Sequence, residues 1–220
     1  MGKFVKTTFH EKENRASVIL ERIHTDMCGP FSVASTAKHR YYVFFVDDCS
    51  RRCWIFFMQN KDQTFSKFCE FKALVEKESG KQVKALRSDN GGEYISNEFK
   101  EFCSKEGIRR ELIAPHKPQQ NGVTKRKNRT IMGAARAMLH DQGLPMHLWA
   151  EACNIAVYVQ NHCPHRVLGM STPEEPFTGK KPDISHLKIF GSSIYIHVTN
   201  DQNWIKDLRI SSKFKFTGLG

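Results

Sequence analysis

Two acidic side chains stand where they could hold metal ions for phosphoryl transfer. Asp26 follows His24-Thr25, and Asp89 opens the segment DNGGEY. Two-metal transfer of a phosphodiester needs carboxylates from separate elements, because Mg²⁺ prefers oxygen ligands and two ions stabilise the attacking and leaving oxygens. An acid on a central strand, one at a neighbouring strand exit and one on a helix would form such a site. Asp26 and Asp89 fit the first two positions, although isolated acids at strand ends are also common.

The segment that follows Asp89 is more specific than either acid alone. Gly91 and Gly92 permit a tight backbone turn close to a substrate. A plain turn at a strand exit would explain Asn-Gly-Gly but not an acid at each end. Glu93 is interpreted as a supporting acid near the site or as a surface residue.

A strongly basic stretch follows the acidic segment. Residues 105–136 contain nine Lys or Arg and two Glu. A predicted helix at 124–141 carries KRK at 125–127 and Arg129 in its first turns, where positive charge opposes the helix dipole. Phosphates of a nucleic acid would offset that cost. A generic basic surface and a nuclear-import signal are the alternatives.

Composition supports a folded, nucleic-acid-associated class. The 220 residues are 40% hydrophobic, and 34 basic against 23 acidic residues give a net charge of +11. No run of 18 apolar residues predicts a membrane span, and the first residues lack the apolar stretch of a secretory signal. Seven cysteines, an odd number without a CxxC pair, indicate reduced thiols. The expected location is therefore nuclear or cytoplasmic.

The elements that must position these residues can be predicted from hydrophobic periodicity and breakers. We expect three strands, then helix, strand, helix, strand and two long helices, forming a mixed sheet flanked by helices. The predicted strands are 20–31, 41–46, 53–58, 83–86 and 108–113. The predicted helices are 61–79, 97–106, 124–141 and 145–161. Residues 171–183 are expected to be an extended linker because of their Pro and Gly content, and 187–198 a β-hairpin.

Several long motifs, in order, resemble the integrase core of copia-type LTR retrotransposon Pol polyproteins. They include HTDMCGP at 24–30, YVFFVDDCSRRCW at 42–54 and LRSDNGGEY at 86–94. They continue with APHKPQQNGVTKRKNRT at 114–130 and then at 144–164 and 172–191. The resemblance implies an α/β chain with an RNase H-like fold and a short C-terminal β-rich extension.

The resemblance also implies a site of two aspartates and one glutamate that binds Mg²⁺ or Mn²⁺, processes cDNA 3′ ends and joins them to target DNA. Asp26 and Asp89 match the aspartates. The glutamate is expected after 35 intervening residues, which are 90–124, so its position is 125 and holds Lys125. Neighbours on the same helix face supply no acid, although Asn121 or Asn128 could offer a neutral oxygen. Gly133 stands where the family usually has Glu.

The leading hypothesis is a degenerate integrase core that binds DNA without catalysing integration, as a homo-oligomer if functional and without a membrane. The alternatives are an active two-metal nuclease or integrase with an unidentified third ligand, and a pseudogene-derived structural fragment that binds no DNA. Residues 1–18 are expected to be a linker after a zinc-binding domain, 19–165 the core, and 166–220 a linker and truncated β-rich extension. The expected DNA contacts are Lys117, Gln119, Gln120, Asn121, Lys125, Arg126, Lys127 and Arg129.

Overall fold

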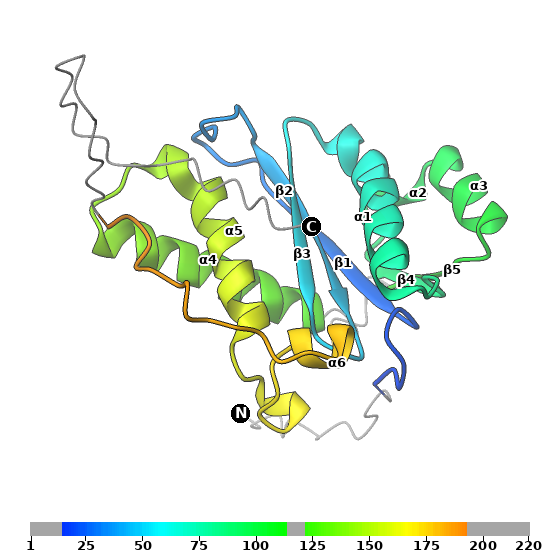
Figure 1. Cartoon of the computed structure of the whole chain (residues 1–220). Helices are drawn as coiled ribbons and strands as arrows, with labels where there is room; N and C mark the ends of the chain where they lie inside the picture. Colours follow the sequence, from blue (N-terminus) through cyan, green and yellow to red (C-terminus); the bar gives the residue numbers. More distant parts are fainter. Residues whose placement is uncertain (1–14, 114–121, 193–220) are drawn as a thin grey trace, which may run out of the picture.

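A five-stranded mixed sheet forms the centre of the computed structural model, which describes residues 15–113 and 122–192. The strand order is β3-β2-β1-β4-β5 (Figure 1). β1 pairs with β2 and β2 with β3 in antiparallel fashion, whereas β4 runs parallel to both β1 and β5. The strands are β1 (Ile23–Cys28), β2 (Tyr41–Asp47), β3 (Cys53–Met58), β4 (Ala85–Ser88) and β5 (Arg109–Leu112).

Helices cover both faces of this sheet. α1, α2 and α3 lie on one side, and α4 and α5 on the other (Figure 1). The long helices are α1 (Thr64–Ser79), α3 (Asn97–Lys105), α4 (Gly122–Asp141) and α5 (Trp149–His162). The short ones are η1 (Lys61–Gln63), α2 (Gly92–Ile95), η2 (Met146–Leu148), η3 (Arg166–Leu168) and α6 (Glu174–Thr178).

The interior strand β2 explains why both faces are covered. Its side chains alternate between a core beneath α4 and α5, with Tyr42 and Phe44, and a core beneath α1, with Val43 and Phe45. A strand buried on both faces reads as a continuous apolar run rather than an alternating one. The ring of Phe45 stacks on that of Phe71 with centroids 4.3 Å apart. The hairpin predicted at 41–58 is confirmed.

One predicted segment was wrong in conformation. Residues 171–183 were expected to be an extended linker, but Glu174–Thr178 form α6. Pro173 precedes the helix and Gly179 ends it in the left-handed conformation at φ 74°, so both breakers act as boundaries. Phe177 is buried because its ring packs edge-on against Trp54 at 5.0 Å. The domain boundaries given above remain predictions.

The remaining predictions about local structure have mixed outcomes. α2 was read only as a turn, because a four-residue helix is too short to show periodicity. The predicted hairpin at 187–198 lies largely outside the described residues, and 187–192 form turns and irregular backbone. All seven cysteines are free, as expected. Within the described parts of the chain, none of the helices has the length and apolarity to cross a bilayer.

Candidate active site

Asp26 lies inside β1 and faces α4. Side chains alternate along a strand, and Thr25 points the other way, where its hydroxyl lies 3.1 Å from the hydroxyl of buried Tyr94. Asp26 is half-buried, and its Oδ1 accepts a hydrogen bond from the Met27 N–H at 2.9 Å. The prediction that Asp26 lies in the first strand is confirmed.

Asp89 directly follows β4, as predicted. β1 and β4 run parallel and His24 pairs with Arg87, so Asp26 and Asp89 each lie two residues further along at the same edge of the sheet. The Oδ1 of Asp89 accepts a hydrogen bond from the Gly91 N–H at 3.0 Å. This contact closes the turn between β4 and α2, which is the role that glycine was expected to permit.

The electrostatics of Asp26 show which charges surround it. Burial raises its pKa from 3.8 to about 6, and the charge of Asp89 raises it as well. The Met27 N–H and the Lys125 ammonium act in the opposite direction, whereas Glu93 adds a smaller increase. Two further carboxylates and one ammonium therefore lie within electrostatic range of Asp26. Clustered carboxylates of this kind favour protonation or a cation.

Lys125 lies in the first turn of α4 with an exposed side chain. Its neighbours on the helix supply no acid. The Oδ1 of Asn128 accepts a hydrogen bond from the Tyr42 hydroxyl, which directs this amide into the core, and Gly122 and Arg129 lack a carboxylate. The hypothesis that Asn128 offers a neutral oxygen to the site is therefore not supported, and Asn121 lies outside the described residues.

Glu93 is closer to the acids than the sequence alone indicated. Its carboxylate folds back over the turn, so that a Cβ placed on Gly91 would lie 2.7 Å from its Oε1. Glu93 is half-buried in α2 and acts electrostatically on both Asp26 and Tyr94. The spacing in DNGGEY was the signal that could have placed it, because Glu93 follows Asp89 by only four residues.

The donor set does not match a site for two divalent ions. Asp26 and Asp89 provide carboxylate oxygens, but position 125 provides an ammonium, which repels a cation. Across residues 15–113 and 122–192, no three His, Cys, Asp or Glu side chains are arranged as a metal site. We therefore derive no reaction step through a bound ion.

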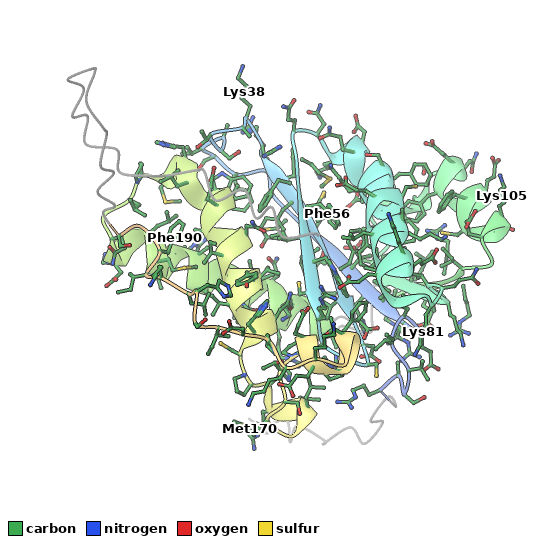
Figure 2. All side chains as sticks on the ribbon, in the orientation of Figure 1. Lys38, Phe56, Lys81, Lys105, Met170 and Phe190 are labelled. Atoms are coloured by element: carbon green, nitrogen blue, oxygen red, sulfur yellow. The ribbon has the colours of Figure 1, made fainter. Side chains whose placement is uncertain are left out.

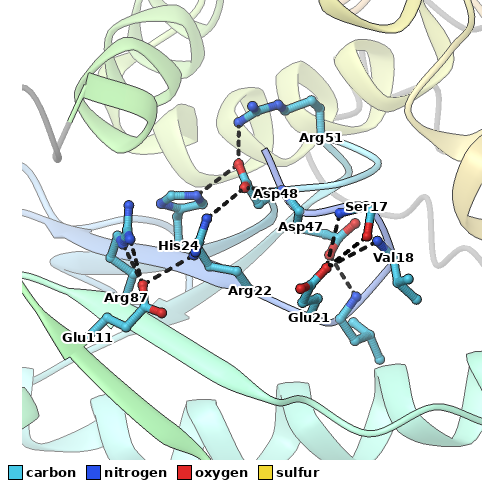
Figure 3. Close-up of polar contacts among 12 residues, drawn as sticks. Ser17, Val18, Glu21, Arg22, His24, Asp47, Asp48, Arg51, Arg87 and Glu111 are labelled. Atoms are coloured by element: carbon cyan, nitrogen blue, oxygen red, sulfur yellow. Dashed lines mark hydrogen bonds and ion pairs between the residues drawn. The ribbon is translucent and has the colours of Figure 1, made fainter. Parts of the chain in front are cut away.

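A network of charged side chains surrounds the buried Asp48 (Figure 3). The sequence alone did not indicate this network. Asp48 accepts a hydrogen bond from the Ala16 N–H at 2.9 Å and forms ion pairs with Arg51 at 3.0 Å and Arg22 at 3.4 Å. The Nε2 of His24 lies 3.1 Å from its Oδ1. Burial alone would raise the pKa of Asp48, but these contacts together hold it well below its usual range.

The network continues across the sheet to the strand that carries Asp89. Arg22 also pairs with Glu111 at 3.2 Å, and Glu111 pairs with Arg87 at 2.6 Å. His24 precedes Asp26 by two residues, and Arg87 precedes Asp89 by two. Members of the network are thus the same-face neighbours of both acids, so the network fixes the relative positions of β1, β4 and β5.

The predicted DNA contacts divide into two groups. Lys125, Arg126 and Arg129 are exposed on α4, and Lys127 is half-buried, with its Nζ donating to Gln160 Oε1 at 3.3 Å. Lys117, Gln119, Gln120 and Asn121 lie outside the described residues. The basic run therefore does not form one face of the helix.

A mixed five-stranded sheet with helices on both faces, an acid inside β1 and another directly after β4 is typical of the RNase H-like fold. A chain of the simian T-cell lymphotropic virus intasome has the same fold, with a TM-score of 0.62 at 19% identity over 82% of this chain and 63% of that one. The HTLV-2 integrase catalytic core domain, solved with magnesium in its trimeric form, gives 0.56 at 21% identity over 74% and 99%.

Residues 20–118 match the integrase core domain family. It is 44% identical over 201 residues to the Pol polyprotein from transposon TNT 1-94 of Nicotiana tabacum, which covers 91% of this chain and 15% of that protein. It is 32% identical over 195 residues to the Pol polyprotein from transposon RE2 of Arabidopsis thaliana, covering 89% and 13%. The chain thus spans about one seventh of these curated relatives.

Proposed function

We propose that this chain is an integrase core that binds DNA but does not catalyse two-metal strand transfer. The single observation that carries this proposal is Lys125. The match to the integrase core domain family supports the polynucleotidyl transferase class. A lysine in place of the third carboxylate changes the charge of the site by two units and removes an oxygen ligand.

The physical case rests on competition for the same carboxylates. The ammonium of Lys125 already stabilises the charged form of Asp26, as the direction of its effect on the Asp26 pKa indicates. A divalent ion at this site would have to bind next to that ammonium. Two like unit charges about 4 Å apart repel by roughly 4 kcal/mol at an effective dielectric constant near 20, and the repulsion is larger for a divalent ion. Weak metal binding follows.

DNA binding is supported by charge and its placement. The first turns of α4 hold four basic residues, and α4 has no acid in its first turn. Positive charge in the first turns destabilises a helix when no anion is near, whereas a phosphate beside these side chains offsets that effect. The proposed ligands are retroelement cDNA ends and target DNA, bound by a homo-oligomer in the nucleus or cytoplasm. The solved proteins of similar fold include an intasome chain and a trimeric catalytic core domain.

A strand-transfer assay with Mg²⁺ or Mn²⁺ tests the inactivity directly. We expect no joined product from the wild-type chain at enzyme concentrations where Lys125→Glu gives product. Asp89→Asn in the Lys125→Glu background is the matched control and should abolish that product. Robust turnover by the wild-type chain would contradict the proposal.

A second candidate function is an active nuclease or integrase that uses another third ligand. The position of Glu93 favours this alternative, because its carboxylate lies beside the Asp89 turn and acts on Asp26. In that case the wild-type chain should bind Mn²⁺ in calorimetry, and Glu93→Gln should weaken the binding. If Glu93→Gln has no effect while the wild type binds Mn²⁺, Glu93 is not the ligand.

A further inference from the structure

Five basic side chains from four separate segments gather beside the turn between β2 and β3. Arg51 lies in that turn, Arg15 precedes β1, Arg126 and Lys127 are in α4, and His165 follows α5. We call this set the turn patch. Arg15 ties the first segment to η3, because its Nη1 donates to the Val167 carbonyl at 2.9 Å.

Hydrogen bonds link the segments of the patch: the Val167 N–H donates to His165 Nδ1 at 3.3 Å, and the Ala16 N–H donates to Asp48, the partner of Arg51, at 2.9 Å. Electrostatic effects among the basic side chains agree with this placement. Burial lowers the pKa of His165, and the charges of Lys127, Arg51 and Arg15 lower it further. Burial likewise lowers the pKa of Arg51. The carboxylates of Asp48 and Asp47 oppose that shift, whereas Arg15 and Arg126 add to it. Each segment of the patch is therefore within range of Arg51 or His165.

Nearby acids do not neutralise the patch. Asp48 pairs with Arg51, but it shares its charge with Arg22 and lies against His24. Asp47 is fully buried, and its carboxylate accepts hydrogen bonds from Ser50 and from the Leu20 N–H. Arg15 and Lys127 donate to neutral oxygens of Val167 and Gln160. An excess of positive charge therefore remains at the surface.

Helix geometry separates this surface from the side of α4 that faces the acids. Residues 125 and 129 are four apart and lie on one face of α4. Residue 127 is two positions from 125, a rotation of about 200° at 3.6 residues per turn. The contact of Lys127 with Gln160 of α5 confirms that it points away from Asp26. The KRK run thus contributes Lys125 to the side of α4 that faces the acids and Lys127 to the turn patch.

The turn holds Arg51 in a conformation that few residues of its type adopt. Its φ is 63°, in the left-handed region. The Arg51 N–H donates to the Asp47 carbonyl at 2.9 Å, and its Nη1 contacts Asp48, so backbone and side chain are both fixed. The guanidinium is consequently held in one position with 15% of the side chain exposed, so a phosphate would contact its exposed end while Asp48 holds Nη1.

We propose that the turn patch binds the phosphate backbone of duplex DNA as a second contact surface, separate from the α4 face that carries Lys125 and Arg129. This inference rests on the DNA binding proposed above and adds residues outside the basic run. Arginine and lysine neutralise phosphates without reading bases, so the contact is independent of sequence. It would orient a duplex that also passes the acids.

Fluorescence anisotropy with a short labelled duplex, measured over a series of salt concentrations, tests the inference. The test variant is Arg15→Gln/Arg51→Gln. The matched control is Lys81→Gln/Lys105→Gln, which removes the same charge on the α1–α3 side of the molecule (Figure 2). Each phosphate contact contributes about 0.9 to the slope of log K against log salt, so the test variant should lose nearly 2 and the control should lose less than half of that.

Arg51→Gln removes an ion pair of Asp48, so folding is checked by thermal unfolding. The single variant Arg15→Gln keeps that pair and should still lower the slope by about 0.9. If the wild type binds DNA and the test variants match the control, the turn patch is not a DNA contact. If the wild type fails to bind the duplex at low salt, the proposed function itself is wrong.

Discussion

At the scale of single residues, the proposed function depends on position 125. The acids around it are intact in position: Asp26 and Asp89 share one edge of the sheet, and Glu93 lies beside them. Burial raises the pKa of Asp26, and the charges of Asp89 and Glu93 raise it further. A carboxylate at 125 would add to that charge and attract a cation, whereas Lys125 offsets it. We therefore expect the side chain at position 125 to determine whether the acids bind a metal ion or have their negative charge offset by Lys125.

Asp48 provides a prediction on pH at the same scale. Its folded pKa lies below its ordinary value of 3.8, so it contributes stability above that value and loses it as the pH falls through the folded pKa. The unfolding free energy of the wild type should drop between about pH 4 and pH 2. In urea unfolding, Asp48→Asn should be less stable at pH 7 by about 3 kcal/mol, because a buried pair loses one partner. The difference between the two proteins should shrink toward pH 2.

The control for this prediction is Asp141→Asn, a change of the same type at an exposed residue near the end of α4. It should leave the pH profile close to that of the wild type. Equal stability of Asp48→Asn and the wild type at pH 7 would show that the network does not stabilise the fold.

At the scale of elements, a glycine within α4 lowers the stability of this helix. Gly133 lies in the middle of this helix, is exposed, and would meet no atom within 4 Å if it bore a Cβ. Gly133→Ala should therefore stabilise the chain by about 1 kcal/mol, the usual difference in helix propensity. Chemical denaturation measures this effect. Gly179→Ala is the contrasting variant and should destabilise, because its φ of 74° is strained for alanine.

α6 gives a second prediction at this scale. Phe177 packs against Trp54, and the Arg52 guanidinium lies 4.6 Å from its ring centroid. Phe177→Ala should lower the unfolding free energy by about 3 kcal/mol, the lower end of the range for buried phenylalanine. A thermal melt of this variant beside exposed Val167→Ala checks it. Unchanged stability of Phe177→Ala would mean that α6 behaves as the extended linker first expected.

These elements also show what the sequence could predict. The hairpin at 41–58 followed from dense apolar runs, which have few alternatives in a folded chain, whereas the strand position of Asp26 followed from loose alternation that ends at Gly29-Pro30. α6 was missed because its proline and glycine were read as linker residues rather than as helix boundaries. The charge network was missed because it joins positions distant in sequence, such as Arg22 and Glu111. Glu93 was noticed, but only the fold of the Asp89 turn gave its distance from the acids.

At the scale of the whole molecule, charge is distributed over two surfaces. One surface holds the acids and the α4 face with Lys125, and the other is the turn patch. Among the described residues, basic side chains from separate segments meet at the turn patch, within a chain whose net charge is +11. A protein with this distribution should bind DNA with strong dependence on salt, even when the chemistry of strand transfer is lost.

Calorimetric titration with Mn²⁺ tests the central claim most directly. The comparison is between the wild-type chain and Lys125→Glu, with Asp89→Asn in the Lys125→Glu background as the control. We predict that Lys125→Glu binds Mn²⁺ at least about tenfold more tightly than the wild type, equivalent to about 1.4 kcal/mol, and that the control loses this gain. Equal Mn²⁺ affinity in the wild type and Lys125→Glu would contradict the assignment of position 125 as the lost metal ligand.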